Sequence, residues 1–151
     1  MKRPLGIAIV AAALALGACG GSRGIEDLGG GVLKDPATGL EWSQSDNGAD
    51  IDWPAARDWC AARGAGWRLA TIEELAALYD PSGAKHAPCG NYDGQPMTCN
   101  VSPLFRLSGP TPWTRSDDIA RPLIFGLSPL RKGPGPIDGI DGARALCVRK
   151  G

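Results

Sequence analysis

Apolar residues at helical spacing mark a first helix near the middle of the chain. Trp59 and Cys60 lie three and four residues after Ala56, which places all three side chains on one face of a helix. Asp52 is a suitable N-cap, and Pro54 fits the first turn, where a missing N–H costs no hydrogen bond. The pattern predicts a short helix that stops at the next glycine, with Trp59 and Cys60 on its buried face.

A capping box predicts a second helix a few residues further on. Thr71 is the cap and Glu74 the third helical residue, so the side chain of each bonds to the backbone N–H of the other. Leu75 and Leu78 supply the apolar face of this helix. The Asp-Pro pair that follows Tyr79 ends it.

Short strands are predicted on both sides of the helices. Val32–Asp35 and Leu40–Ser43 flank a turn that contains proline and glycine, which indicates a β-hairpin. Further strands are predicted at residues 67–69, 111–115, 123–127 and 143–149. Residues 80–108 and 132–142 are rich in glycine and proline without a period, so we predict two loops there, the first of them long.

The chain begins like an exported bacterial lipoprotein. Basic Lys2 and Arg3 precede an apolar run that is too short to span a bilayer as a helix. The run ends in Leu-Gly-Ala-Cys, which resembles a lipobox, the signal for acylation of its cysteine, Cys19. An ordinary secretory signal with a chance cysteine is the alternative. The predicted divisions are a signal peptide over 1–18, a glycine-rich tether over 19–30 and a single domain over 31–151.

Lipidation of Cys19 would hold the protein at a membrane. Each buried methylene group of an acyl chain adds about 0.8 kcal/mol of membrane affinity, so several chains anchor stably. Residue 20 is glycine and not aspartate, which for such lipoproteins implies the outer membrane. We therefore expect an outer-membrane lipoprotein, on the periplasmic face or at the cell surface.

The cysteine count indicates two disulfides in an oxidising compartment. The domain has four cysteines, an even number that allows three pairings: Cys60, Cys89, Cys99 and Cys147. Cys89 and Cys99 bound a short polar loop and are expected to pair, which leaves Cys60 for Cys147. A zinc site is the alternative, but the chain has one histidine, His86, and no Cys-x-x-Cys motif. We expect no metal and no cofactor.

The two parts of the mature chain differ in charge. Residues 19–105 carry 6 basic and 12 acidic side chains, whereas residues 106–151 carry 8 basic and 4 acidic ones. This favours an anionic ligand near the C-terminal strands, with an ordinary mixed surface as the alternative. The candidate ligand-binding residues are cations of this part and the tip of the stapled loop: Asn91, Tyr92, Asp93, Arg106, Arg115, Arg121, Arg131 and Lys132. A slightly acidic exported chain without a basic stripe is not expected to bind nucleic acid.

No group of residues suggests catalysis. His86, the one histidine, lies in a segment without a nucleophile motif. Glu73 and Glu74 are adjacent and point to different helix faces, so they do not form a carboxylate pair. The acidic loop residues are interpreted as turn formers and not as calcium ligands: Asp117, Asp118, Asp138 and Asp141.

Several spaced motifs run through the domain. They are Val32-x-x-Asp35-x-x-Thr38-Gly39-Leu40-x-Trp42, Trp53-x-x-Ala56-x-x-x-Cys60, Trp67-Arg68-Leu69-x-Thr71-x-x-Glu74-Leu75, Trp113-Thr114-x-Ser116 and Cys147-Val148-Arg149. Together they resemble a known bacterial family, the Lcl C-terminal domain family. The resemblance implies an α+β, C-type lectin-like domain with two short helices packed on small antiparallel sheets and long disulfide-stapled loops. It also implies a disulfide from the first helix to the last strand, which matches Cys60–Cys147.

Members of this family are exported, often as lipoproteins or adhesin modules, and the founding adhesin's domain binds sulfated glycosaminoglycans. The chain departs from the family at Ala70, where proline is usual, and lacks complete calcium motifs of C-type lectins. The motif tryptophans are interpreted as core residues and not as a sugar-stacking platform: Trp42, Trp53, Trp59, Trp67 and Trp113. Arg68 and Arg149 are expected to lie against acidic partners.

The resulting hypothesis is a non-catalytic lectin-like lipoprotein that binds an anionic glycan or an envelope protein. One alternative is an oxidase of the formylglycine-generating type, which shares the lectin-like fold and needs free cysteines. A purely structural envelope module is the other.

Overall fold

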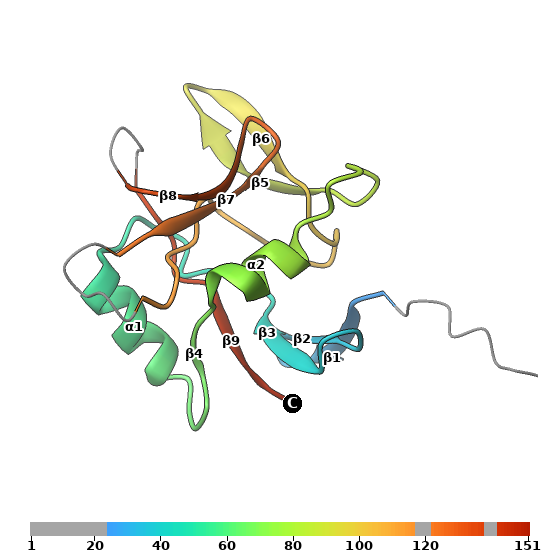
Figure 1. Cartoon of the computed structure of the whole chain (residues 1–151), viewed down its shortest axis with the longest axis vertical. Helices are drawn as coiled ribbons and strands as arrows, with labels where there is room; N and C mark the ends of the chain where they lie inside the picture. Colours follow the sequence, from blue (N-terminus) through green and yellow to red (C-terminus); the bar gives the residue numbers. More distant parts are fainter. Residues whose placement is uncertain (1–23, 117–121, 138–141) are drawn as a thin grey trace, which may run out of the picture.

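The main sheet joins the two ends of the domain (Figure 1). The protein is described by a computed structural model over residues 24–116, 122–137 and 142–151. Antiparallel neighbours follow the order β1 (Glu26–Gly29), β2 (Val32–Asp35), β3 (Leu40–Ser43), β9 (Cys147–Lys150) and β4 (Arg68–Leu69). Because β9 lies between β3 and β4, this sheet is complete only when the last residues of the chain are in place.

The predicted hairpin of β2 and β3 is confirmed, and Asp35 organises its turn. The carboxylate of Asp35 accepts hydrogen bonds from the Ala37 N–H at 3.0 Å and the Thr38 hydroxyl at 2.7 Å. Gly39 has φ +74° and donates its N–H to the Asp35 carbonyl at 2.8 Å. Glycine adopts this left-handed conformation without steric cost, which explains why Asp35 and Gly39 occur together here.

Both predicted helices are present, α1 over Trp53–Ala61 and α2 over Ile72–Leu78. The Asp52 carboxylate caps α1 by accepting from the Ala55 N–H at 2.9 Å. Both bonds of the capping box between Thr71 and Glu74 are formed, at 3.2 and 2.9 Å. These caps satisfy N–H groups that a helix start leaves without partners.

The buried face of α1 differs from the prediction. Its buried residues are Trp53, Ala56 and Cys60, whereas Trp59 is only half-buried. Trp59 lies at the edge of this stripe, where the guanidinium of Arg63 stands 5.4 Å from its ring centroid. The first tryptophan of the helix, and not the second, therefore points into the core.

Two further hairpins lie beyond the main sheet, in the upper part of Figure 1. They are formed by β5 (Ala87–Tyr92) with β6 (Gln95–Cys99) and by β7 (Ile124–Ser128) with β8 (Arg131–Gly135). The predicted long loop over 80–108 is therefore wrong where β5 and β6 pair. The predicted loop over 132–142 is wrong where β8 pairs with β7.

One predicted strand is absent, and another begins later than expected. Residues 111–115 form isolated bridges, Pro112 with Arg144 and Trp113 with Ile124, and no regular strand. The last strand covers Cys147–Lys150 and not 143–149. Neighbouring residues in 111–115 bridge to different segments, Pro112 to Arg144 and Trp113 to Ile124, so a continuous ladder of β pairs does not form.

The two predicted disulfides are both formed, Cys60–Cys147 and Cys89–Cys99. The first ties α1 to β9 within an apolar cluster that also includes the motif tryptophans Trp53, Trp67 and Trp113. The second joins β5 to β6 within another cluster, which also contains Trp42, Leu75, Phe105 and Phe125. The structure is thus a small α+β domain with two helices, small antiparallel sheets and two disulfides.

The predictions for the N-terminus concern residues that the structure does not describe. The expected signal peptide, residues 1–18, and the expected lipidation site, Cys19, lie outside the described residues. The expected tether over 19–30 includes β1, which pairs with β2, so the folded part begins before residue 31. Within the described ranges, no helix has both the length and the apolar character needed to cross a bilayer.

Candidate functional site

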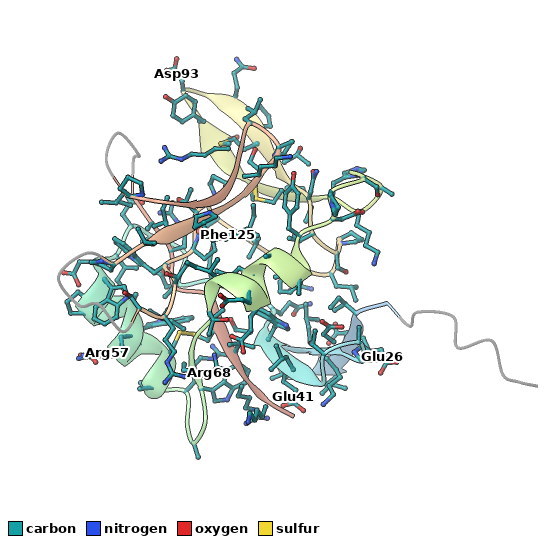
Figure 2. The ribbon with its side chains drawn as sticks, in the orientation of Figure 1. Glu26, Glu41, Arg57, Arg68, Asp93 and Phe125 are labelled. Atoms are coloured by element: carbon teal, nitrogen blue, oxygen red, sulfur yellow. A yellow bond between two sulfur atoms is a disulfide. The ribbon has the colours of Figure 1, made fainter. Side chains whose placement is uncertain are left out.

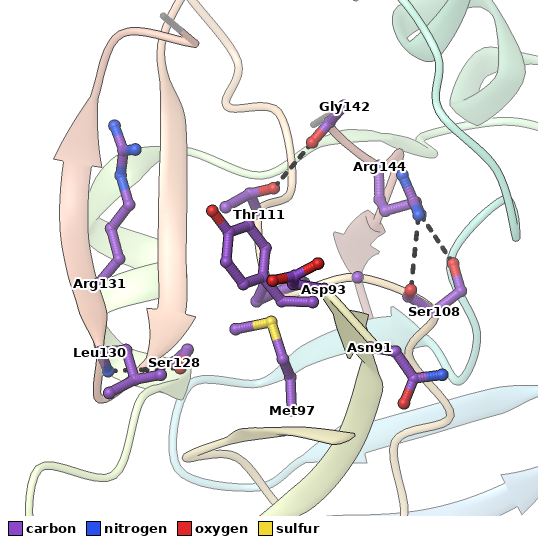
Figure 3. A pocket seen from close by; sticks show the side chains of 13 residues that line it. Asn91, Asp93, Met97, Ser108, Thr111, Ser128, Leu130, Arg131, Gly142 and Arg144 are labelled. Atoms are coloured by element: carbon purple, nitrogen blue, oxygen red, sulfur yellow. Dashed lines mark hydrogen bonds between the residues drawn. The ribbon is translucent and has the colours of Figure 1, made fainter. Parts of the chain in front are cut away.

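A pocket of about 280 Å³ opens between the tips of the two outer hairpins (Figure 3). We call it the hairpin pocket. Residues 91–93 and Met97 come from β5–β6, and residues 128, 130 and 131 come from β7–β8. Segments 108–111 and 142–144 complete the lining. Four stretches that are distant in sequence therefore meet at one opening.

The hairpin tips present large apolar side chains to solvent. Tyr92 is 61 % exposed and Leu130 is 87 % exposed, and both line the hairpin pocket. Tyr92 precedes a two-residue turn in which Asp93 has φ +48° and Gly94 has φ +74°, the conformation of a tight hairpin turn. Exposed apolar groups that gather at one opening indicate a binding surface more strongly than scattered ones.

Arg144 forms a rigid wall of the hairpin pocket. Its Nε donates to the Ser108 hydroxyl at 2.8 Å, and its Nη1 pairs with the Asp50 carboxylate. Ser108 in turn donates its N–H and its hydroxyl to the buried Asp46, each at 2.7 Å. This chain of bonds holds the Arg144 guanidinium in place and leaves Arg131 as the more available cation at the opening.

Arg131 lies on β8 beside the opening and is exposed. Its Nη2 donates to the Pro136 carbonyl at 3.2 Å, and the other N–H groups of this guanidinium point to no acceptor within the described ranges. A guanidinium has five N–H donors, so Arg131 keeps donors for a ligand oxygen. The Arg131 guanidinium and the Asn91 amide thus lie in the same pocket as the aromatic Tyr92 and the aliphatic Leu130.

The β5–β6 hairpin is held close to the 108–111 segment. A Cβ atom on Gly90, which has φ +85°, would stand 2.3 Å from the Ser108 carbonyl oxygen. Cys89 forms a parallel bridge with Leu107, and its disulfide to Cys99 closes the base of the hairpin. One side of the hairpin pocket is therefore positioned by a glycine contact and a covalent bond.

The predicted ligand-binding residues do not gather at one site. Asn91, Tyr92, Asp93 and Arg131 line the hairpin pocket. Arg106 and Arg115 line two separate surface clefts, and Lys132 is exposed but lines none of these three sites. Arg121 and the acidic loop residues Asp117, Asp118, Asp138 and Asp141 lie outside the described residues.

Sequence reasoning missed a second group of pocket residues, which includes Met97, Ser108, Thr111, Leu130 and Arg144. They carried no motif. Met97 and Ser108 lie in the predicted loop over 80–108, Thr111 and Arg144 lie in predicted strands, and Leu130 lies between the predicted strand over 123–127 and the predicted loop over 132–142. The Asp93-Gly94 dipeptide was an available signal, since such pairs are typical of two-residue hairpin turns.

The remaining motif residues have structural contacts. The Trp53 and Trp113 indoles donate to the carbonyls of Thr114 at 2.9 Å and Ile51 at 2.7 Å. Arg68 forms two bonds to the Glu74 carboxylate, at 2.8 and 2.7 Å, which confirms its expected acidic partner. Arg149 likewise bonds Glu41 at 2.8 Å.

The interpretation of the hairpin pocket rests on its geometry, because comparisons with known proteins found no match. No family model, no curated protein and no solved structure matches this chain. Within the described ranges, no group of three or more histidine, cysteine, aspartate or glutamate side chains is arranged to hold a metal ion. The hairpin pocket, with aromatic, aliphatic, amide and guanidinium groups, is suited to binding a small polar ligand or one unit of a larger one.

Proposed function

We propose that this chain is an exported outer-membrane lipoprotein whose lectin-like domain binds an anionic glycan or an envelope protein without catalysing a reaction. The proposal includes membership of the Lcl C-terminal domain family, which the spaced motifs suggest. The observation that carries the binding function is the hairpin pocket, where Tyr92 and Leu130 are exposed beside the Arg131 guanidinium.

The groups of the hairpin pocket fit a sugar that bears a negative charge. An aromatic ring such as that of Tyr92 offers an apolar face to a sugar ring, and the Asn91 amide both donates and accepts hydrogen bonds. The guanidinium of Arg131 suits a carboxylate or a sulfate because its fork matches two oxygens. Asp93 also lines the pocket and adds one negative charge beside this guanidinium.

The disulfides support the non-catalytic form of the proposal. Cys60, Cys147, Cys89 and Cys99 are all bonded, so none of these four is a free thiol. An oxidase of the formylglycine-generating type needs free cysteines, and this alternative would require a different redox state of the domain. Alkylation of the unreduced protein distinguishes them, since two free thiols per chain would favour the oxidase.

The position of the first described strand supports an outward-facing pocket. β1 lies at the lower right of Figure 1, whereas the tips of β5–β6 and β7–β8 lie at the top. An anchor on Cys19 would connect to the domain through β1. The hairpin pocket would then be free to meet a ligand on the side away from the anchor.

The binding function is tested by retention of the purified protein on immobilised heparin. We expect retention at low salt that is lost as the ionic strength rises, because salt screens exposed charge pairs. Arg131→Gln is expected to weaken binding about tenfold, since it removes a charge-assisted bond. Tyr92→Ala is expected to weaken it to a similar degree through loss of the aromatic face.

Lys132→Gln is the matched control, because Lys132 is the next residue of β8, is exposed and does not line the hairpin pocket. It changes the net charge by the same amount as Arg131→Gln. If both variants lose equal affinity, binding follows overall charge and the pocket has no special role. Absence of retention at low ionic strength would remove the anionic-ligand form of the proposal.

A further inference from the structure

A second cleft, of about 390 Å³, lies between α1, β4 and residues 115 and 116. We call it the arginine cleft. Three arginines from three different segments line it: Arg57, Arg68 and Arg115. The remaining lining residues are Trp53, Gly66, Trp67, Leu69 and Ser116. Arg57 and Arg68 lie along α1 and the strand beside it in Figure 2.

Arg68 is the fixed cation of the arginine cleft. Both of its terminal nitrogens bond the Glu74 carboxylate, and Nη1 also donates to the Leu69 carbonyl at 3.1 Å. The hydrogen bond from Arg68 lowers the pKa of Glu74, against the opposing effect of burial, and so keeps this carboxylate charged. The pair therefore contributes a rigid wall with little net charge.

Arg115 is the available cation. Its backbone N–H donates to the Ala70 carbonyl at 2.6 Å, which fixes the residue beside β4. Its side chain is exposed, and within the described ranges its guanidinium has no hydrogen bond or ion pair. Arg115 and Arg68 line the same cleft, and the charge of Arg115 adds a small contribution to lowering the pKa of Glu74, after the Arg68 and Thr71 bonds.

Two further arginines, Arg63 and Arg149, lie beside the Trp67 ring that lines the arginine cleft. Arg63 stands 4.9 Å and Arg149 4.7 Å from the centroid of the Trp67 ring. Arg57 stands 5.7 Å from the Trp53 ring and bonds the exposed Asp58 at 2.9 Å. Each of Arg57, Arg68 and Arg149 has a carboxylate partner, whereas Arg63 and Arg115 have none within the described part of the chain. Among the described residues, Arg115 is therefore the arginine lining the cleft that has no carboxylate partner.

We propose that the arginine cleft binds a tetrahedral oxyanion, the phosphate group of a soluble ester or of a lipid headgroup. A carboxylate has two oxygens and is satisfied by one guanidinium fork, as the Arg68–Glu74 pair in this cleft shows. Arg57, Arg68 and Arg115 come from three segments, and each guanidinium keeps N–H donors beyond the bonds described above. Donors from several segments fit an anion whose oxygens point in more than two directions. Trp53 and Trp67 beside them are buried, and the Trp53 ring packs against the Arg57 guanidinium.

The test is a titration of the ¹⁵N-labelled full chain with inorganic phosphate, followed by NMR at constant ionic strength. We expect saturable shifts of the Gly66 amide and of the Trp53 and Trp67 indole N–H signals. Arg115→Gln is expected to weaken phosphate binding at least about tenfold, because it removes the cation that has no protein partner. Sodium acetate, tested in parallel, is expected to give no saturable shift.

Arg106→Gln is the matched control, because Arg106 is also exposed and its side chain has no hydrogen bond or ion pair within the described residues. It is expected to leave phosphate binding at the arginine cleft unchanged. Shifts that do not saturate, equal losses in Arg115→Gln and Arg106→Gln, or equal binding of acetate would each overturn the proposal. Glucose 6-phosphate and phosphatidylglycerol vesicles then distinguish the soluble ester from the lipid source.

Discussion

Glu74 serves three purposes with one carboxylate. It completes the cap of α2 through the Thr71 N–H, at 2.9 Å, and it neutralises Arg68 through two bonds. It also places a negative charge in the first turn of α2, where the helix dipole is favourable. These bonds link β4 to α2, so a single residue connects the local structure of a helix start with the packing of the sheet.

Stability is expected to fall in acid because of Glu74. Its pKa in the folded protein lies below the usual value of 4.5, chiefly because of the Arg68 bond. The folded state thus binds this proton less tightly than the unfolded state. The ionised Glu74 carboxylate therefore stabilises the folded state fully above the unfolded pKa, and this stabilisation is lost as pH falls through the folded pKa. Glu74→Gln is expected to cost about 1 to 2 kcal/mol at neutral pH and to flatten this acid dependence. Urea denaturation at a series of pH values between pH 3 and 7 measures both the loss of unfolding free energy and its dependence on pH.

Glu73→Gln is the control for this prediction, since Glu73 is the neighbouring residue in the same first turn and is exposed. Its replacement is expected to cost only a few tenths of a kcal/mol, through the helix dipole alone. An acid dependence that is the same in both variants would show that the Arg68–Glu74 pair does not govern it.

At the scale of elements, the β5–β6 hairpin depends on one close backbone approach. Gly90 and Gly94 both have positive φ, at +85° and +74°, so alanine is strained at either position. Only at Gly90 would the new Cβ meet backbone, the Ser108 carbonyl oxygen at 2.3 Å, whereas nothing lies within 4 Å of the corresponding atom at Gly94. Comparing alanine at Gly90 with alanine at Gly94 therefore separates the effect of the backbone contact from the effect of the strained φ angle.

Gly90→Ala is therefore expected to destabilise the domain by about 1 to 3 kcal/mol more than Gly94→Ala, the cost of forcing extra volume into a packed contact. Thermal or urea denaturation of the oxidised protein measures the difference. Gly90→Ala should also displace the β5–β6 side of the hairpin pocket and weaken ligand binding. Equal stabilities of the two variants would mean that the hairpin is not pressed against the 108–111 segment.

The same hairpin shows which elements local sequence signals predict. The turn of β2 and β3 was predicted because Asp35, Pro36 and Gly39 have the required chemistry in adjacent positions. β5 and β6 were missed because Pro88 and Pro96 interrupt the strands and the register shifts between Pro88 and Asn91. Pairing there depends on the Cys89–Cys99 bond and on contacts with residues 107–109, which no local pattern reveals.

At the scale of the molecule, the Cys60–Cys147 disulfide spans a sequence separation of 87 residues. The chain-entropy model gives a closed loop of this size a stabilisation of about 4 to 5 kcal/mol. The bond ties α1 to β9, the strand that lies between β3 and β4. The two ends of the domain are therefore held together by a covalent bond as well as by the sheet.

The proposed anchor predicts where the whole protein is found in the cell. Cys19→Ser removes the acylated thiol, so the variant is expected to move from the membrane fraction to the soluble fraction, because the acyl chains supply the membrane affinity. Fractionation with immunoblotting measures this, and mass spectrometry of the unsubstituted protein should find acyl chains on Cys19. An unmodified Cys19 in the mature protein, or an unchanged distribution of the variant, would contradict the anchor.

The distribution of charge over the surface differs from the distribution of charge along the sequence. The excess of basic residues after position 105 suggested one anionic-ligand surface. The fold places Arg131 at the hairpin pocket, Arg115 at the arginine cleft and Arg106 at a third cleft. It also brings Arg57 and Arg68, from the acidic part of the chain, into the arginine cleft, because α1 and β4 pack beside residue 115.

Local chemistry was sufficient for the features that neighbouring residues create. Both helix caps, the Asp35 turn and the pairing of four cysteines followed from residue types and short spacings, since these interactions span few residues or few alternatives. The two candidate sites depended on the folded chain. The hairpin pocket is lined by segments between residues 91 and 144, and it is formed only when the Arg144–Ser108 bond and the Gly90 contact bring irregular segments together. Such long-range contacts are set by packing and carry no periodic signal in the sequence.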